Sequence, residues 1–219
     1  MRELAETPSE RPQQRIDVPE VVVARLPQYV RVLNMLLSDD IQVANSQMLG
    51  EKLQVTPAQI RKDLSYFGRF GKQGRGYSVP HLLDELKQIL GLNSQWNVVV
   101  IGVGRLGRAI LSYPGFTPDG FHLVAALDNN PGLVGQDVDG LVVRPVEELN
   151  QVVEEYDISI AVVAVPGVHT QEVIDRLVEC GVRAILNYAP TTPQVPPEVN
   201  IRNIDPVLSL QSMTFYLAN

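Results

Sequence analysis

Three glycines stand in the middle of the chain with the spacing G-x-G-x-x-G, at Gly102, Gly104 and Gly107. The residues before them, 97–101, predict a buried strand, and those after them, 105–113, predict a helix. In this strand–turn–helix context the glycines are typical of a loop that binds a dinucleotide. The first makes a tight turn, the second lets the backbone approach the pyrophosphate, and the third lets helix and strand pack closely. Free N–H groups at the helix start would face the phosphates.

An acidic residue stands where a dinucleotide-binding fold reads the adenosine ribose. Asp128 ends the second predicted strand, residues 122–127, and lies about 20 residues beyond Gly107. A carboxylate there accepts hydrogen bonds from the ribose hydroxyls and repels a 2′-phosphate, which favours NAD(H) over NADP(H). The alternative is a turn residue in the segment Asp-Asn-Asn-Pro. Arg105 and Arg108 lie on the glycine turn rather than after the second strand, so Arg105 is assigned to the pyrophosphate region.

The second half of the chain alternates predicted strands and helices, which indicates a parallel sheet of the Rossmann type. Strands are predicted at 97–101, 122–127, 141–144, 158–165, 183–187 and 199–204, and helices near 105–113, 145–155 and 169–180. The loops after the fourth and fifth strands lie at the ligand edge of such a sheet, so we expect them to contact the nicotinamide half. The predicted cofactor-binding residues are Gly102, Val103, Gly104, Arg105, Leu106, Gly107, Asp128, Val165, Pro166, Asn187, Tyr188, Ala189 and Pro190.

Side chains that could perform catalysis are sparse. A dehydrogenase needs a positioned acid or base and a substrate pocket. Of the three histidines only His169 lies near the predicted nicotinamide loops, and a helix-capping or solvated role is the alternative. The single cysteine, Cys180, predicts packing at a helix end, and the sequence contains no Cys/His metal cluster. We therefore expect the nucleotide to be sensed rather than consumed, with no catalytic residue and no metal.

The first half predicts a small helical unit. Apolar residues recur every three or four positions over residues 19–38, and Pro27 should kink or divide this helix. A second helix is predicted to begin after an N-cap at Asn45 or Ser46. A helix over residues 79–92 links this unit to a boundary near residue 94.

A basic helix and a basic loop lie between these elements. Thr56 and Pro57 are typical of a helix start, and the helix is predicted to run to Phe67. The glycine-rich loop over residues 68–79 predicts the β-ribbon wing of a winged helix. An ordinary helical hairpin with a solvated face is the alternative. DNA binding is favoured because five basic residues and one acid, Asp63, accompany the aromatic residues of this stretch.

Charge separates the two halves. Residues 1–94 carry 12 Lys and Arg against 11 Asp and Glu, whereas residues 95–219 carry 6 against 14. The asymmetry indicates two modules with different partners. The chain contains no apolar run long enough for a transmembrane helix, no signal peptide and a single cysteine, which together favour the cytoplasm and exclude an internal disulfide framework. Residues 1–17 are polar and are expected to be disordered.

Several motifs together resemble the Rex family of redox-sensing transcriptional repressors. They are the run IRKDLSYFG over residues 60–68, the glycine-rich wing, the glycine fingerprint, YPGF over 113–116 and NYAP over 187–190. The resemblance extends from about residue 18 to 219. It implies an α/β chain with a winged-helix DNA-binding domain (18–94), a Rossmann NAD(H)-binding domain (95–204) and a C-terminal helix (205–219) exchanged between the subunits of a homodimer. Packing of that apolar helix on its own domain is the alternative.

The resemblance also implies a function and a set of residues. Such a homodimer binds a pseudo-palindromic DNA operator and releases it when NADH, a regulatory ligand, binds. The residues that match DNA contacts are Arg61, Lys62, Ser65, Tyr66, Lys72 and Arg75, and the trio that matches the family's switch is Arg31, Tyr113 and Asp205. Position 206 is Pro where the family often has an aromatic residue near the nicotinamide, so Tyr188 is the substitute candidate.

Two other functions stay open at the level of sequence. A small NAD-dependent oxidoreductase with a helical dimerisation domain would show turnover. A module for coenzyme A or an adenylate would use the same fold. Equilibrium binding of NADH against coenzyme A and a hydride-transfer assay distinguish them from the repressor.

Overall fold

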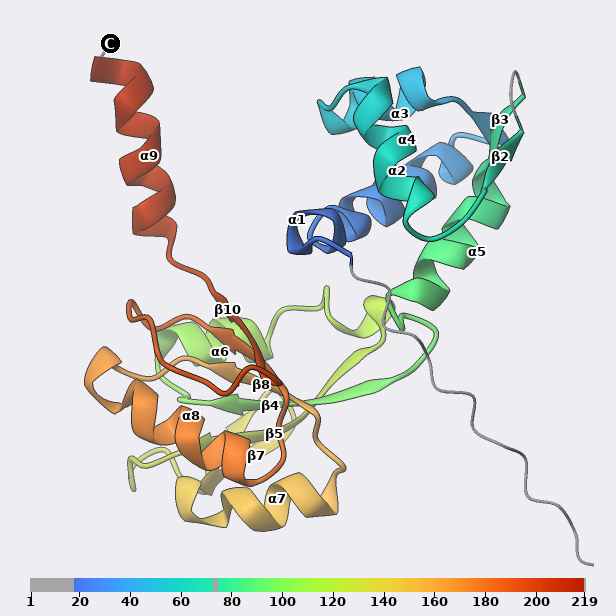
Figure 1. Ribbon diagram of the computed structural model, residues 1–219. Coiled ribbons are helices and arrows are strands. Elements are labelled where there is room, and N and C mark those ends of the chain that lie inside the picture. The colour runs from blue at the N-terminus through green and yellow to red at the C-terminus, as the bar shows by residue number, and fades with distance from the viewer. Residues whose placement is uncertain (1–17, 73–74, 219) are drawn as a thin grey trace, which may run out of the picture. The chain divides into compact units, whose positions relative to one another are not determined.

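The computed structural model describes residues 18–72 and 75–218, and the polar stretch 1–17 predicted to be disordered lies outside them. The chain divides into two compact units, residues 1–92 and 93–219. Figure 1 shows the first unit as helices with a small sheet and the second as a sheet with helices.

The first unit begins with two helices where the pattern predicts one divided helix. α1 spans Glu20–Val23 and α2 spans Leu26–Ser38. Pro27 lies in the first turn of α2, where its missing N–H leaves no hydrogen bond unmade. The division near Pro27 is thus confirmed, and α2 buries Leu26, Tyr29, Val30, Val32, Leu33 and Leu36.

Local signals define the two short helices that follow. α3 (Ser46–Leu53) is capped by Asn45, whose side chain accepts a hydrogen bond from the N–H of Met48 at 2.8 Å. α4 (Pro57–Ser65) is capped by Thr56, whose hydroxyl accepts from the N–H of Gln59 at 3.2 Å. α4 ends at Ser65 rather than at Phe67 as predicted, because the chain turns toward the wing there.

A three-stranded sheet and a final helix complete this unit. Its strand order is β1 (Val43–Ala44), β3 (Gly76–Ser78) and β2 (Gly71–Lys72), with antiparallel pairing throughout. The predicted wing is therefore present as the β2–β3 ribbon. α5 (Val79–Ile89) follows it and turns Val79, Leu82, Leu83 and Leu86 into the core shared with α2 and α4.

The second unit is built on a seven-stranded sheet of order β10-β9-β8-β4-β5-β7-β6. All strand pairs are parallel except β6 with β7. The strands are β4 (Trp96–Ile101), β5 (Phe121–Asp128), β6 (Asp137–Val138), β7 (Leu141–Pro145), β8 (Ile160–Val163), β9 (Ala184–Asn187) and β10 (Asn200–Asn203). The predicted parallel sheet is confirmed. It differs in its antiparallel edge strand β6, which is too short to leave a sequence pattern, and in a shorter fourth strand.

Helices cover this sheet. α6 spans Arg105–Leu111, α7 spans Leu149–Glu155 after a short 3₁₀ turn, and α8 spans Thr170–Glu179 (Figure 1). One apolar core contains residues of β4, β5, β8, α7 and α8, and a second contains residues of β4, α6 and β7. β4 is buried between them, which explains its continuous run of apolar residues.

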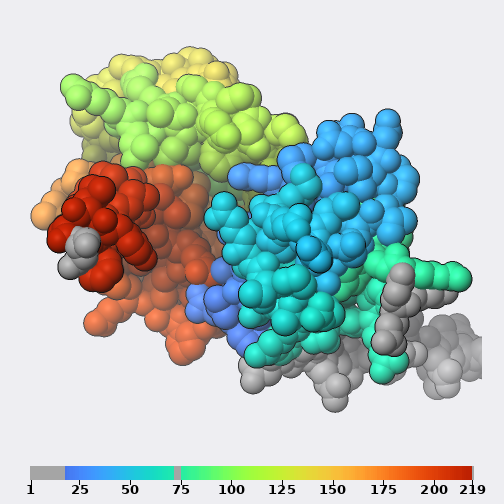
Figure 2. Space-filling view, turned by 90° about the horizontal axis from the view of Figure 1, so that it is seen from above, coloured from blue at the N-terminus to red at the C-terminus, as the bar shows by residue number. Residues whose placement is uncertain are grey.

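The C-terminal helix α9 (Pro206–Ala218) is apolar and has no buried residue. Its large apolar side chains, among them Leu210, Phe215 and Leu217, are 57–87% exposed. The helix as a whole gives the dark red surface in Figure 2. None of the helices within the described residues has the length and hydrophobicity needed to cross a bilayer.

Candidate functional site

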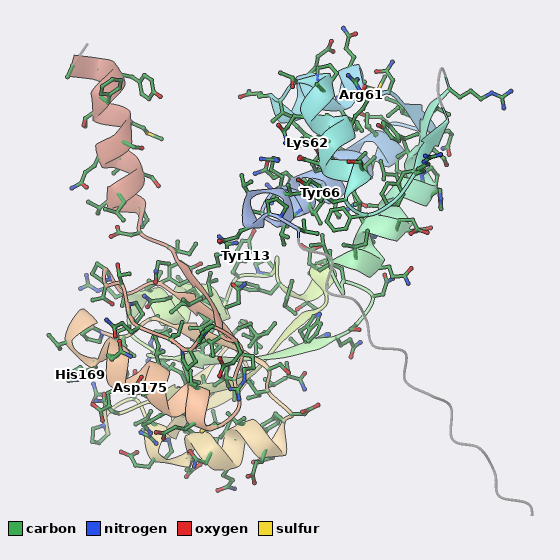
Figure 3. All side chains as sticks on the ribbon, in the orientation of Figure 1. Arg61, Lys62, Tyr66, Tyr113, His169 and Asp175 are labelled. Carbon is green, nitrogen blue, oxygen red and sulfur yellow. The ribbon has the colours of Figure 1, made fainter. Side chains whose placement is uncertain are left out.

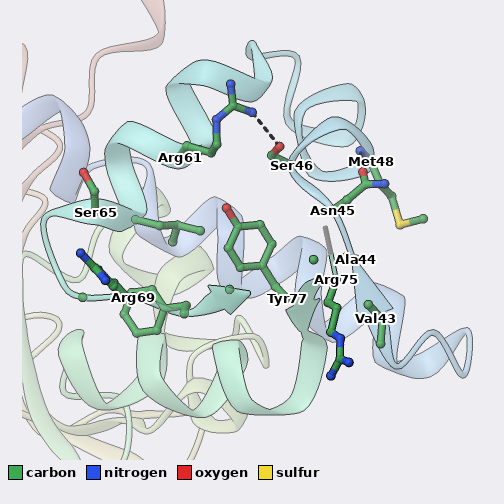
Figure 4. A pocket seen from close by; sticks show the side chains of 15 residues that line it. Val43, Ala44, Asn45, Ser46, Met48, Arg61, Ser65, Arg69, Arg75 and Tyr77 are labelled. Carbon is green, nitrogen blue, oxygen red and sulfur yellow. Dashed lines mark hydrogen bonds between the residues drawn. The ribbon is translucent and has the colours of Figure 1, made fainter. Parts of the chain in front are cut away.

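A groove of about 760 Å³ lies in the first unit between α3, α4 and the wing (Figure 4). Three arginines line it, Arg61 from α4, Arg69 from the loop and Arg75 from the wing. Among the described residues that line it, none is acidic. A concave, acid-free surface with three guanidinium groups suits the phosphates of a nucleic acid.

The structure brings some of the predicted DNA-contacting residues to this groove. Arg61, Ser65 and Arg75 line it, whereas Lys62 is exposed next to the groove and Tyr66 is half-buried at the end of α4. Figure 3 labels Arg61 and Lys62 on α4 and Tyr66 directly after its last residue. The side chain of the sixth predicted residue, Lys72, lies outside the described part of the chain.

Arg69, Ser46 and Tyr77 are among the groove residues that were not predicted as site residues, although all three belong to the elements identified. Ser46 accepts a hydrogen bond from the Arg61 guanidinium at 3.0 Å, drawn as a dashed line in Figure 4. Tyr77 lies in the groove, and burial raises the pKa of its hydroxyl despite the nearby charge of Arg61. The basic and aromatic residues among the wing glycines were a sequence signal from which Tyr77 could have been identified. No comparable signal marks Ser46 as a site residue.

Glycines let the helices and the wing approach one another. A Cβ on Gly50 would lie 2.5 Å from the carbonyl oxygen of Val55, so α3 can meet the turn before α4 only with glycine there. Gly76 has a φ of +73°, and a Cβ on it would lie 2.5 Å from the carbonyl oxygen of Ala44. Gly50 thus lets α3 approach α4, and Gly76 lets the wing pair closely with β1 beside the groove.

A buried carboxylate that sequence reasoning passed over lies behind the groove. Asp63 of α4 has no exposed side-chain surface, and Arg25, at the junction of α1 and α2, donates two hydrogen bonds of 2.7 Å to it. Tyr29 of α2 donates a third at 2.9 Å, and Gln59 of α4 a fourth at 2.7 Å. Burial opposes ionisation, but these donors outweigh it and hold the pKa of Asp63 below its ordinary value.

The second unit contains a pocket of about 550 Å³ at the carboxyl ends of its parallel strands. This edge is where open α/β sheets bind ligands. Of the predicted cofactor-binding residues, those that line it are Gly102, Gly104, Arg105, Leu106, Asp128, Val165 and Pro166. The lining also includes apolar side chains from three further elements, Leu133, Val146 and Val173.

The glycine loop has the geometry that its three positions predict. Gly102 has a φ of +94°. A Cβ on Gly107 would lie 1.8 Å from the carbonyl oxygen of Gly102, so only glycine lets α6 pack against the turn. A Cβ on Gly104 would meet nothing within 4 Å, so its lack of a side chain leaves space at the pocket. Val103 instead points its side chain into the core.

Asp128 holds this loop with its carboxylate. One oxygen accepts the N–H of Val103 at 2.7 Å, and the other accepts the N–H of Asn130 at 2.8 Å. The second bond is the turn interaction weighed as the alternative role of Asp128. Its side chain also lines the pocket, and 9% of the residue remains exposed. Each carboxylate oxygen has a further lone pair, so Asp128 can still accept a hydroxyl.

The structure does not bring the predicted loop over residues 187–190 to this pocket. Asn187 is fully buried, and its side chain makes hydrogen bonds within the protein. Its amide nitrogen donates to the carbonyls of Ala189 and Thr191 and to the side-chain oxygen of Asn203. Its amide oxygen accepts the N–H of Ala189. Its observed role is to shape the loop and to tie it to β10. Contact of this loop with a cofactor stays a prediction.

The three predicted switch residues are divided between the units. Arg31 is exposed on α2 in the first unit. Tyr113 follows α6 in the second, is 60% exposed and packs edge-on against Phe116. Asp205 precedes α9 and accepts the N–H of Val207 at 2.9 Å.

His169 and Cys180 lie at the two ends of α8. His169 precedes the helix, makes no capping hydrogen bond with its side chain and lines the pocket. The thiol of Cys180 contacts Asn150 at 3.0 Å, and burial raises its pKa, which opposes thiolate chemistry. Within the described residues, no three His, Cys, Asp or Glu side chains are arranged to hold a metal ion.

Comparison with known proteins matches both units. Residues 93–191 match the family model "CoA binding domain", and residues 17–65 match "Putative DNA-binding protein N-terminus". The chain is 52% identical to the redox-sensing transcriptional repressor Rex of Roseiflexus sp. (strain RS-1), over 91% of each chain. It is 42% identical to Rex 1 of Thermotoga maritima, over 90% of this chain and 95% of that one.

Solved structures match over the same span. RSP, a Rex-family repressor, in complex with NAD⁺ and operator DNA has a TM-score of 0.87 and 39% identity, and covers 91% of this chain and 92% of its own. RSP in complex with NADH has a TM-score of 0.83 and 37% identity, and covers 92% and 94%. The predicted family, the predicted α/β fold and the predicted non-enzymatic role are thereby confirmed. This chain belongs to the Rex family of redox-sensing transcriptional repressors.

Proposed function

We propose that this chain binds a pseudo-palindromic operator as a homodimer and releases it when NADH binds. The observation that carries the proposal is the presence in one chain of two complementary sites, an acid-free groove with three arginines and a glycine-loop pocket with Asp128. RSP, which is similar over nine-tenths of this chain, has been solved with NAD⁺ and operator DNA and with NADH. A repressor of this kind acts in the cytoplasm.

The DNA contacts are assigned to α4 and the wing. Arg61, Ser65 and Arg75 would meet DNA from the groove. Lys62, Tyr66 and Lys72 are assigned as further DNA contacts on the resemblance alone. Lys62 is exposed, so it suits a phosphate contact, which contributes affinity and salt dependence but no sequence information. Residues 18–94 are assigned as the DNA-binding domain and residues 95–204 as the nucleotide-binding domain.

The nucleotide is assigned to the pocket of the second unit. The N–H groups at the start of α6 would face its pyrophosphate and Asp128 its ribose, while the loops at 165–166 and 187–190 would meet the nicotinamide half. Asp128 favours NAD(H) because its charge repels the 2′-phosphate of NADP(H).

A change of one charge distinguishes the two redox forms. Oxidised nicotinamide is a cation and reduced nicotinamide is neutral, so the trio of Arg31, Tyr113 and Asp205 is assigned to sense it. Different affinities of the two forms for two domain arrangements are sufficient to shift the population. Exchange of the C-terminal segment 205–219, which contains α9, between subunits would cover the exposed apolar side chains of this helix.

The proposal is tested by operator binding at one fixed salt concentration, since affinity for DNA depends steeply on salt. We expect NADH to lower operator affinity, NAD⁺ to change it far less and NADPH to do little. Coenzyme A is included because of the family model that matches the second unit. Operator binding that ignores NADH at a hundredfold excess over its dissociation constant would contradict the proposal.

A variant separates the two sites. Lys62→Ala should weaken operator binding about fivefold to tenfold and lower the slope of affinity against salt by about one phosphate, because it removes one ion pair. NADH affinity should be unchanged. Loss of both activities together would indicate misfolding, and loss of NADH binding alone would contradict the assignment of Lys62.

A further inference from the structure

The carboxylate of Asp63 is saturated by donors from two helices. Arg25 and Tyr29 belong to the α1–α2 segment, which is 34 to 38 residues away from Asp63 in sequence, and Gln59 lies one turn earlier on α4. A buried ion pair with this many directional bonds is geometrically specific, since each donor must remain aligned. Such a cluster fixes an orientation more strongly than apolar contacts do.

Asp63 lies on the back of the helix that lines the groove. It is two residues from Arg61 and two from Ser65, and a helix advances about 100° per residue, so both lie about 200° around α4 from it. Arg61 and Ser65 line the groove while Asp63 is completely buried. Any rotation of α4 that shifts Asp63 therefore shifts the groove-facing side chains by a similar angle.

The polar cluster is the directional link between α4 and α2. The backbone of α4 packs closely on α3, whereas hardly any of its positions approach the backbone of α2. Ile60 and Leu64 share an apolar core with α2, but apolar contacts permit small rotations and slides. The bonds to Arg25 and Tyr29 are directional and resist both.

We propose that Asp63 is a positioning residue for DNA recognition: held by Arg25, Tyr29 and Gln59, it sets the rotation of α4 so that Arg61 and Ser65 meet the operator bases in register. The role rests on the proposed function. It concerns discrimination between DNA sequences more than affinity for DNA in general, because phosphate contacts tolerate small displacements that base contacts do not.

The test uses the full-length chain and two duplexes of equal length. One carries a sequence selected from a random library by the unmodified chain, and the other is a random sequence. Tyr29→Phe is the principal variant, because it removes one hydrogen bond to Asp63 and keeps every charge. Asp63→Asn is the stronger variant. Affinities for both duplexes are measured at one salt concentration and corrected for the folded fraction from circular dichroism.

We expect Tyr29→Phe to lower the ratio of selected-duplex to random-duplex affinity about threefold, and Asp63→Asn to lower it at least about tenfold. Affinity for random DNA should change less than about twofold with Tyr29→Phe. NADH affinity should remain unchanged in both, since the pocket lies in the other unit. If Asp63→Asn does not fold, the affinity ratio of Tyr29→Phe alone tests the positioning role.

Two controls match these changes. Asp84→Asn removes an exposed acid from α5 in the same unit, and Tyr156→Phe removes a phenol hydroxyl from the other unit. Neither should alter the ratio. An unchanged ratio in Tyr29→Phe would overturn the positioning role while leaving the proposed function intact. An unmodified chain that selects no sequence would contradict the proposed function and this role with it.

Discussion

Each unit contains a buried carboxylate at or behind its site, and the two are held in different ways. Asp63 accepts from three side chains, on α4, on α2 and at the junction before α2, while Asp128 accepts from two backbone N–H groups of neighbouring loops. Asp63 is completely buried, whereas 9% of Asp128 remains exposed at the pocket. The first arrangement fixes the orientation of a helix, and the second shapes a loop and leaves lone pairs for a ligand. A carboxylate at a site thus serves as an anchor or as a receptor according to its donors.

The largest expected effect comes from removing the charge of Asp63. Asp63→Asn leaves the Arg25 guanidinium, which is 20% exposed, without its partner, and such losses cost about 3–5 kcal/mol. Urea unfolding followed by circular dichroism should show the first unit unfolding earlier. Fluorescence of Trp96, the single tryptophan, reports on the second unit and should not shift.

The control for this variant is Asp84→Asn, which should change the unfolding free energy by less than about 0.5 kcal/mol. If Asp63→Asn were as stable as that control, the cluster would not anchor α4.

Two glycines of the loop held by Asp128 should separate stability from binding. Gly107→Ala places a Cβ 1.8 Å from the carbonyl oxygen of Gly102, so it should destabilise the second unit by about 3 kcal/mol or more and abolish NADH binding. Gly104→Ala meets nothing within 4 Å, so stability should change by less than about 1 kcal/mol while NADH affinity falls about tenfold. Thermal unfolding and calorimetric titration provide both quantities. Unaltered NADH binding in Gly104→Ala would contradict the assignment of the pyrophosphate to this loop.

Neutralising Asp128 should weaken the ligand site more than the fold. Asp128→Asn keeps one acceptor oxygen but replaces the other by a donor that opposes a backbone N–H, so NADH affinity should fall about tenfold or more. NADPH should gain relative to NADH, because the repulsion of its 2′-phosphate is lost. Equilibrium titrations of both nucleotides, with Asp175→Asn on α8 as a control outside the pocket lining, measure this. An unchanged NADH-to-NADPH ratio would leave Asp128 as a turn residue only.

The smallest effect is the pH dependence of the Asp63 anchor. Hydrogen bonds from Arg25, Gln59 and Tyr29 outweigh the effect of burial and hold the pKa of Asp63 below its ordinary 3.8. The pKa values of Arg25 and of Tyr29, which faces Tyr77, are raised, so both donors stay protonated. The unfolded chain therefore binds the proton first as the pH falls. The stabilisation from Asp63 should be complete above about pH 5 and be lost as the pH falls through the folded pKa.

Unfolding free energies of the unmodified chain and of Asp63→Asn, measured at several pH values, test this sign. The difference between them should be constant from about pH 5 to 7 and shrink below about pH 4. A difference that grows toward low pH would contradict the direction of the shift.

Local signals explain why much of this molecule could be predicted from its sequence. Thr56 and Pro57 define the start of α4, Pro27 divides the first helix, and the glycine loop follows an unbroken apolar strand. The groove and the pocket arise at positions that such signals mark. The pocket of the second unit could be predicted because the strand order brings the glycine loop and the loop after β8 to the same edge of the sheet.

The remainder depends on partners distant in sequence. Asp63 reads as a lone acid in a basic helix, and its main partner Arg25 is 38 residues earlier with no periodicity to connect them. The sequence pattern predicts Asn187 as a polar loop residue at the ligand edge. Only the fold shows that its amide forms hydrogen bonds with Ala189 and Asn203 inside the protein. The β6 strand of two residues is likewise too short to predict.

The central claim is that one nucleotide event in the second unit changes DNA binding by the first, and reciprocal linkage tests it most directly. NADH affinity should be measured calorimetrically at one salt concentration, without DNA and with a saturating amount of the selected duplex. If NADH weakens operator binding by some factor, the operator must weaken NADH binding by the same factor. We predict equal factors of about tenfold or more, with NAD⁺ affected far less. An NADH affinity that is identical with and without operator would contradict the account.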